Sequence, residues 1–274
     1  METVVQRYRT LFANAAYTRS LGQGAAFLAA SIIAIFAAVS FATNNASNHV
    51  ADLILSNVGP YNMRFAFVYG TFVMFAITAA LFALKPNRLP FGLKAMALFL
   101  LIRAVFISLT HIAPSPIDPQ APAPFLNSIF YGSDQFFSGH TGMPFLTALA
   151  FWHIPALRYF FLSSTVFFGA VVLLGHYHYS IDVLAALFIT HGIFQMACYL
   201  FRQDFVLFRA SEAVPRAPKK AQSRVGKWVA SKRRKRGASG PDAVPEPATA
   251  AGDPFRLHVV GDEQQPAAAA GRAP

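Results

Sequence analysis

The sequence predicts an all-α membrane protein, built as a bundle of six transmembrane helices with both termini in the cytoplasm. Of its 274 residues, 55% are hydrophobic and only 13% are charged, whereas soluble domains carry about 25% charged residues. The chain also contains 28 phenylalanines, and its apolar residues gather in runs long enough to cross a bilayer, which takes about 20 residues. Lipid is therefore the expected solvent of this protein.

Each membrane span is predicted from one apolar run. Five runs stand apart from one another, over residues 24–43, 64–84, 91–112, 159–176 and 180–201. The continuous apolar stretch from 143 to 175 is too long for one span. A further span is therefore expected over 139–157, with a tight turn at 155–158, which brings the total to six.

Basic residues are distributed unevenly among the connections between these spans. The first and third connections, 44–63 and 113–138, contain no Lys or Arg. The N-terminus, the second and fourth connections and the segment after the last span contain Arg7, Arg9, Arg19, Lys85, Arg88, Arg158 and Arg202, and Lys94 lies just beyond the second connection. Because Lys and Arg are enriched in cytoplasmic loops, the first and third connections are expected outside and both termini inside.

Two segments flank the expected six-helix domain, which occupies residues 21–205. Residues 1–20 have apolar side chains at helical spacing, which predicts an interfacial amphipathic segment. Residues 210–274 are basic, rich in Ala and Pro and without periodicity, which predicts a disordered cytoplasmic tail. The basic run 232–236 favours binding to anionic lipids, and no sequence module supports nucleic-acid binding. The single cysteine, Cys198, excludes an intramolecular disulfide.

Two polar segments precede membrane spans and are the candidates for chemistry. DQFFSGHT covers residues 134–141 and GHYHYSID covers residues 175–182. Ionisable groups beside or within spans are costly and indicate function by default. Both following spans run from outside to inside in the predicted topology, so His140, His178 and Asp182 are expected together at the outer face.

The spacing of these residues suits proton and phosphoryl transfer. His178 and Asp182 are four residues apart, so near a helix N-terminus they share one face. The carboxylate can fix the tautomer of the imidazole and raise its basicity, which makes His178 a plausible nucleophile. His140, with Ser138 and Thr141 beside it, could protonate a leaving oxygen. This arrangement needs no metal and no other cofactor.

The same residues allow other interpretations. Polar residues at helix ends often serve only to satisfy backbone groups. His176 adds a second histidine before His178 and could bind zinc together with His140 and Asp134. Arg103, in the middle of the third span, suits either a lipid phosphate or an ion pair with a buried carboxylate. Tyr179 suits either the interfacial aromatic belt or an active site.

The two polar segments resemble the third and fourth conserved motifs of sphingomyelin synthases, a branch of the type 2 phosphatidic-acid phosphatase superfamily. The segment 103–116, RAVFISLTHIAPSP, is similar to their second motif. The resemblance spans roughly residues 50–205. It implies that His178 is the nucleophile, Asp182 its partner, and His140 the general acid and later the general base. It also implies substrate-binding roles for a further set: Arg103, Asp134, Ser138 and Tyr179.

The chain differs from the lipid phosphatases of that superfamily. These carry a Ser-Arg pair six residues before the nucleophilic histidine, where this chain has Val172, and a lysine–arginine–proline motif that this sequence lacks. The first motif of the synthases is echoed only weakly, by Asp52 and Pro60. These differences favour the synthase-like branch over the simple phosphatases.

The expected activity is transfer of a phospho-head group from a glycerophospholipid to ceramide or another lipid alcohol. With water as the acceptor, the same site would act as a lipid phosphatase or phospholipase C. A lipid transporter is the non-enzymatic alternative, although the inverted repeats of many transporters are not evident in this sequence. The Ala-, Pro- and Arg-rich tail suggests a bacterial cytoplasmic membrane, with the site facing outward.

The charge pattern predicts which connections an impermeant reagent reaches. In a Cys198→Ala background, a cysteine at Ser128 should react with an impermeant thiol reagent in intact cells, and a cysteine at Asn87 should react only after lysis. The measurement is labelling before and after permeabilisation. The reverse pattern would place the two histidine segments on the cytoplasmic side.

Overall fold

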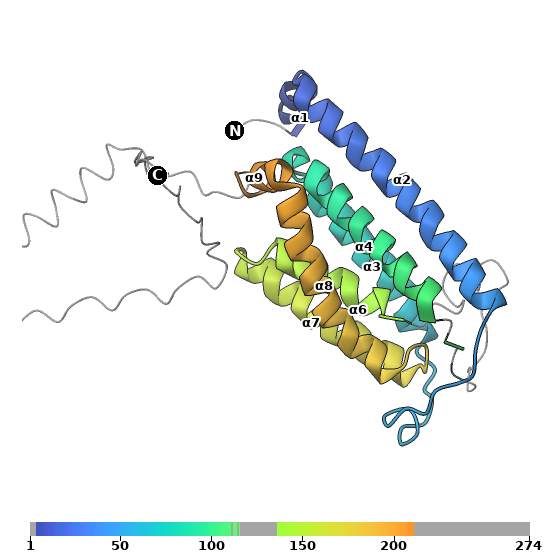
Figure 1. Ribbon diagram of the computed structural model, residues 1–274. Coiled ribbons are helices and arrows are strands. Elements are labelled where there is room, and N and C mark those ends of the chain that lie inside the picture. The colour runs from blue at the N-terminus through green and yellow to red at the C-terminus, as the bar shows by residue number, and fades with distance from the viewer. Residues whose placement is uncertain (1–3, 111, 114, 116–135, 211–274) are drawn as a thin grey trace, which may run out of the picture. The chain divides into compact units, whose positions relative to one another are not determined.

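A computed structural model describes residues 4–110, 112, 113, 115 and 136–210, so the expected tail and Asp134 lie outside the described residues. This part of the chain contains eight α-helices and one 3-10 helix (Figure 1). They are α1 (Val4–Phe12), α2 (Ala15–Asn44), α3 (Arg64–Ala83), η1 (Pro86–Arg88), α4 (Leu89–Thr110), α6 (Gly139–Ala150), α7 (Pro155–Leu174), α8 (Ser180–Leu200) and α9 (Arg202–Ala210). The predicted all-helical class is confirmed.

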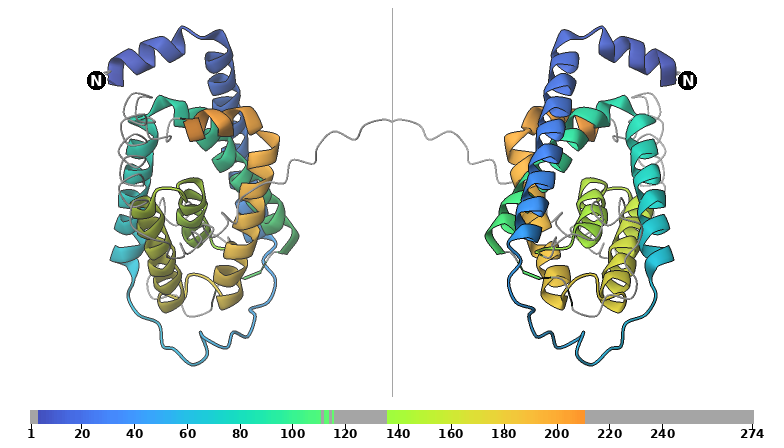
Figure 2. Two further views of the ribbon diagram at one scale, coloured as in Figure 1. Left: turned by 90° about the vertical axis from the view of Figure 1, so that its left-hand side faces the viewer. Right: turned by 90° about the vertical axis from the view of Figure 1, so that its right-hand side faces the viewer.

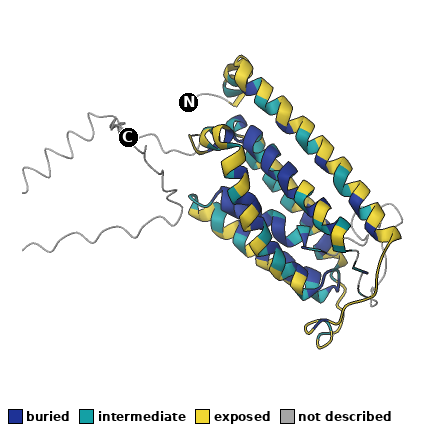
Figure 3. Ribbon diagram, in the orientation of Figure 1, coloured by how far each residue is buried: buried dark blue, intermediate teal, exposed yellow. Residues whose placement is uncertain are grey.

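Five of these segments are long and apolar enough to cross a membrane. They are α2, α3, η1 with α4, α7 and α8, and each contains most of one predicted apolar run. Exposed residues recur along these helices (yellow in Figure 3). They include large apolar ones such as Leu109, Val166 and Phe188, which are each more than 70% exposed. Exposed apolar faces of this kind fit an integral membrane protein, because lipid tails replace water around them.

The sixth expected span is shorter than the sequence suggested. Helix α6 has 12 residues and is therefore about 18 Å long, compared with about 30 Å for the hydrocarbon core. The turn that follows it lies at residues 151–154 and not at 155–158, because Pro155 begins α7 and cannot donate a backbone hydrogen bond within the turn. A crossing of the membrane by α6, and the orientation of the termini, remain predictions.

The N-terminal segment 1–20 does not form one continuous helix. Helix α1 ends at Phe12, and the side chain of Asn14 caps α2 by accepting hydrogen bonds from the backbone N–H groups of Ala16, at 2.9 Å, and Tyr17, at 3.4 Å. Figure 2 shows α1 at a steep angle to α2, at the end of the bundle where α9 also lies. The expected interfacial segment 1–20 therefore consists of α1, a short turn and the first residues of α2.

Small residues bring α2 close to α4. The buried residues Tyr17, Gly24, Ser31 and Ala38 recur at seven-residue intervals along α2, so they form one stripe that faces α4. A Cβ atom on Gly24 would lie 3.3 Å from the Cβ atom of Leu93. Close packing through small residues is the usual way for helices to associate where no water drives them together.

Polar contacts close the end of the bundle where α9 lies. The Lys94 ammonium pairs with a carboxylate oxygen of Asp204 at 2.6 Å and donates to the Ser20 hydroxyl at 2.8 Å. Ser20 in turn donates to the other oxygen of Asp204 at 2.5 Å. These contacts join α2, α4 and α9, so the buried charges of Lys94 and Asp204 satisfy each other.

Candidate functional site

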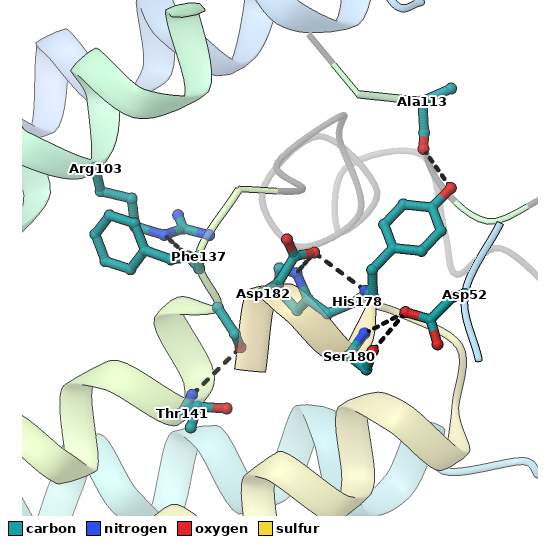
Figure 4. Close-up of polar contacts among 10 residues, drawn as sticks. Asp52, Arg103, Ala113, Phe137, Thr141, His178, Ser180 and Asp182 are labelled. Carbon is teal, nitrogen blue, oxygen red and sulfur yellow. Dashed lines mark hydrogen bonds and ion pairs between the residues drawn. The ribbon is translucent and has the colours of Figure 1, made fainter. Parts of the chain in front are cut away.

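The two polar segments meet where α6 and α8 begin. The backbone N–H of Ser138 donates to the backbone carbonyl of Asp182 at 3.1 Å, and the Ser138 hydroxyl caps α6 by accepting from the Thr141 N–H at 3.3 Å. Ser138 and Asp182 are both completely buried. The structure therefore brings the starts of α6 and α8 to one end of the bundle, although α7 separates the two segments in sequence (Figure 1). Figure 4 shows His178 and Asp182 there, and the ring of His140 lies 6.4 Å from that of His178 between centroids.

Asp182 links the start of α8 to the imidazole of His178. One of its carboxylate oxygens accepts from the backbone N–H of Tyr179 at 3.1 Å and lies 3.3 Å from His178 Nδ1. Both side chains are buried, with His178 only 5% exposed. A carboxylate at Nδ1 favours the tautomer that carries its proton there, which leaves Nε2 as the basic nitrogen.

His140 lies opposite this pair, in the first turn of α6. Its ring centroid is 6.4 Å from that of His178 and 4.2 Å from that of Phe67, which packs against it from α3. Among the described residues, neither His140 Nδ1 nor the second carboxylate oxygen of Asp182 has a hydrogen-bond partner, and both atoms are buried. Buried polar atoms without partners are uncommon and call for an explanation, which a bound polar ligand would supply.

Arg103 reaches the same region from α4. Its Nε donates to the carbonyl oxygen of Phe137 at 3.0 Å, immediately before α6 (Figure 4). A Cβ atom on Gly139 would lie 3.3 Å from the Arg103 guanidinium carbon, so the glycine leaves room for the guanidinium. Arg103 is 6% exposed and lies beside His140 on the wall of a cavity.

This cavity extends from the polar residues into the apolar part of the bundle. It has a volume of about 410 Å³, and α2, α3, α4, α6 and α7 all contribute to its wall. Arg103, Gly139 and His140 line one part of it, whereas most of the remaining wall is apolar, including Ile32, Met74 and Phe99. A second cavity of about 280 Å³ shares five wall residues with the first, namely Phe75, Thr78, Met96, Met143 and Thr147. The first cavity suits an amphiphile with a charged group and an apolar chain.

Each motif contains a non-glycine residue in the left-handed region of backbone conformation. Phe137 has a φ angle of 27° and His176 a φ angle of 55°, which is costly for residues with a Cβ atom. Buried contacts hold both residues: Arg103 binds the Phe137 carbonyl, and His176 Nε2 lies 2.9 Å from the carbonyl oxygen of Val58. Such strain often occurs at functional sites.

Of the three remaining predicted residues, the structure describes Tyr179 and Ser138 but not Asp134. Tyr179 is 2% exposed, and its hydroxyl donates to the carbonyl oxygen of Ala113 at 2.9 Å. Burial, followed by the nearby carboxylates of Asp182 and Asp52, raises the pKa of Tyr179, so the phenol keeps its proton at neutral pH. Its substrate-binding role, like that of Ser138, stays a prediction. Asp134 lies outside the described residues.

A zinc site of His176, His140 and Asp134 was the metal alternative. Across residues 4–110 and 136–210, no three His, Cys, Asp or Glu side chains are placed to hold a metal ion. His176 Nε2 lies 2.9 Å from the carbonyl oxygen of Val58. Because Asp134 lies outside the described residues, the zinc alternative stays a prediction.

Sequence reasoning missed the contribution of α3 and the connection before it. Phe67 is 1% exposed and touches both His140 and Tyr177, with ring centroids 4.2 and 4.5 Å apart. Asp52 binds the first residue of α8. An aromatic residue in an apolar run carries no local signal for such a position, and Asp52 gave only the weak resemblance to a family motif.

The fold and the site together define a class: a multi-pass helical membrane protein with paired histidines and a carboxylate where two helices begin. Residues 132–199 match the family described as PAP2 superfamily C-terminal, and this match includes α6, α7 and most of α8. The match supports the PAP2 superfamily and an enzyme that acts on phosphorus-containing groups. Searches among curated proteins and among solved structures gave no match.

The close contact around Gly142 predicts that one added methyl group at this position lowers the stability of the protein. A Cβ atom there would lie 2.8 Å from ring atoms of the buried Phe99 and 2.9 Å from the Thr190 hydroxyl oxygen. Gly142→Ala should lower the free energy of unfolding by about 1–3 kcal/mol, measured by thermal unfolding in detergent.

Gly192→Ala on α8 is the matched control, because nothing lies within 4 Å of its Cβ position. This variant should be neutral or more stable by about 0.5–1 kcal/mol, as expected for alanine over glycine in a helix. Equal stability of the two variants would show that α6 does not depend on this close approach.

Proposed function

We propose that this protein transfers a phospho-head group from a glycerophospholipid to ceramide or another lipid alcohol, with His178 as the nucleophile. The observation that carries the proposal is the buried His178–Asp182 pair facing His140, next to an apolar cavity that Arg103 also lines. The match to the PAP2 superfamily supports chemistry at phosphorus. The apolar cavity wall supports lipid as the substrate.

In the first half of the proposed reaction, Nε2 of His178 attacks the phosphorus atom of the donor. A nitrogen–phosphorus bond forms, and the phosphorus–oxygen bond to diacylglycerol breaks. His140 gives a proton to the departing oxygen, so diacylglycerol leaves as a neutral alcohol. The two imidazole centroids lie 6.4 Å apart, a separation that lets both rings reach a phosphodiester group between them.

In the second half, His140 accepts the proton of the incoming hydroxyl group, whose oxygen attacks the phosphorus atom. The nitrogen–phosphorus bond breaks and His178 is regenerated. Asp182 stabilises the positive charge on the His178 ring while that ring carries the phosphoryl group. With water in place of a lipid alcohol, the same steps give hydrolysis, so the acceptor decides the class of reaction.

The test is to supply reconstituted protein with phospholipid labelled in its head group, together with ceramide or a diacylglycerol whose acyl chains differ from those of the donor. The proposal expects a new lipid that carries the labelled head group and depends on the added acceptor. Release of only a water-soluble phospho-head group would identify a hydrolase. Intact donor, together with its movement between leaflets, would identify a transporter and overturn the enzymatic proposal.

The role of His140 predicts a dependence on the leaving group. His140→Ala should lower the rate with a natural donor by about 10²–10⁴-fold. The loss should shrink with a nitrophenyl phosphodiester, because nitrophenolate departs without a proton. His191→Ala, on an exposed position of α8, should leave both rates unchanged. An equal deficit of His140→Ala with the two donors would contradict the general-acid role.

The cavity predicts a second, separate effect on long-chain donors. Thr78 lines both cavities, so Thr78→Phe should obstruct the space for an apolar chain. We expect kcat/KM for a long-chain donor to fall by about 10- to 100-fold, with little change for a short-chain, water-soluble donor.

Val73→Phe provides the control on the same helix. Val73 is 58% exposed and contributes to neither cavity wall. If both variants changed the long-chain rate equally, the effect would come from α3 as a whole and not from the cavity.

A further inference from the structure

The connection between α2 and α3 fastens the turn that carries His178. His176 Nε2 contacts the carbonyl oxygen of Val58 at 2.9 Å, and the backbone N–H of Tyr61 donates to the carbonyl oxygen of Leu174 at 2.8 Å. Asp52 adds a contact on the other side of His178, because it binds Ser180. The connection is therefore attached to residues on both sides of the nucleophile.

The Asp52 carboxylate is fully used by these contacts. One oxygen accepts from the Ser180 N–H at 2.7 Å and from the Ser180 hydroxyl at 2.8 Å. The other accepts from the N–H groups of Ile54, at 2.9 Å, and Leu55, at 3.0 Å. Asp52 is 8% exposed, and Figure 4 shows its carboxylate directed at the start of α8. Four donors on one carboxylate hold it in a single orientation.

Two carboxylates thus bind consecutive N–H groups at the start of α8. Asp182 binds that of Tyr179 and Asp52 binds that of Ser180. A helix start leaves such donors without partners inside the helix and favours negative charge beside them. Asp182 sets the ring orientation of His178 from within α8, whereas Asp52 holds the backbone of the same turn from 128 residues away in sequence.

We propose that Asp52 is a positioning residue for the phosphoryl transfer, which fixes the backbone turn that presents His178 without touching the substrate. The inference rests on the proposed function. Asp52 does not line the cavity of Arg103 and His140, so it has no expected part in binding the lipid chain. Its loss should change the rate of the chemical step while binding of the donor stays the same.

The pKa of Asp52 agrees with a carboxylate that stays charged while it binds Ser180. Burial on its own would raise this pKa, but the hydrogen bonds from Leu55, Ser180 and Ile54 outweigh that effect and lower it below its ordinary value near 3.8. The carboxylate is therefore ionised at neutral pH. Its contribution to stability is present above the ordinary carboxyl range and is lost only as the pH falls through the lowered value.

The test compares Asp52→Ala, Asp52→Asn and Asp204→Ala in the full-length reconstituted protein. Asp204 is also 8% exposed and also accepts from a serine hydroxyl, but it lies with Lys94 beyond the far end of α8. Asp204→Ala therefore reproduces the loss of a buried carboxylate without affecting the His178 turn. The readouts are kcat and KM with phosphatidylcholine, the rate of phosphohistidine formation, and hydrogen exchange of residues 176–182.

Asp52→Ala should lower kcat and the rate of phosphohistidine formation by about 10- to 100-fold, as expected for a displaced nucleophile, with KM nearly unchanged. Exchange of the 176–182 amides should become faster. Asp52→Asn, which keeps one acceptor oxygen, should recover part of the rate. Asp204→Ala should leave kcat and this exchange as in the wild type.

Several outcomes would overturn the inference. Faster exchange in Asp52→Ala with an unchanged kcat would show that the turn does not need Asp52 for catalysis. A rise in KM alone would make Asp52 a substrate contact, and equal losses in Asp52→Ala and Asp204→Ala would reduce its role to general stability. Wild-type protein that neither turns over phospholipid nor forms phosphohistidine would refute the proposed function itself, and the positioning role with it.

Discussion

Asp182 joins the two helix starts from which the site is built. Its backbone carbonyl accepts from Ser138, just before α6, and its carboxylate accepts from Tyr179 and contacts His178. One residue therefore sets the distance between α6 and α8, caps α8 and orients an imidazole. Because its side chain is completely buried, these bonds are shielded from water, and removal of the carboxylate would leave buried donors without partners.

Polar groups are concentrated at both ends of the bundle, with apolar helix surfaces between them. The Lys94–Asp204 pair lies at one end, and the two histidines with Asp182 lie at the other. The first set is joined by an ion pair that satisfies both charges, as a buried structural contact requires. The second set retains buried nitrogen and oxygen atoms without partners among the described residues, on His140 and Asp182. This difference distinguishes an ion pair that stabilises the fold from a candidate site in which a polar ligand would supply the missing partners.

The helices were predictable from the sequence because their cause is local. A run of apolar residues in lipid must satisfy its backbone internally, and a helix is the solution available to a single segment. The meeting of His140 with His178 was also predictable, because the alternation of spans places the starts of α6 and α8 at one end. The length of α6 was not predictable, because the turn at residues 151–154 contains only one polar residue, His153, and no Gly or Pro.

The partners of several polar residues were not predictable, because these contacts join segments that are far apart in the sequence. Arg88 and Lys94 suggested a cytoplasmic loop by charge alone, but Arg88 lies over the Phe151 ring at 4.8 Å and Lys94 pairs with Asp204. Asp52 showed only a weak resemblance to a motif, although it binds Ser180. Such partners follow from how the helices pack, and neither periodicity nor charge counting contains that information.

The starts of α6 and α8 also differ in how well each would bind the negatively charged phosphate of the proposed reaction. At α8, Asp182 and Asp52 already occupy the N–H groups of Tyr179 and Ser180. A phosphate at that helix end would compete with two carboxylates and be repelled by them. The start of α6 differs, because the Arg103 guanidinium lies beside Gly139. In the proposed reaction the phosphate therefore binds toward α6, where cationic and helix-end attraction add together, and His178 approaches it from the α8 side.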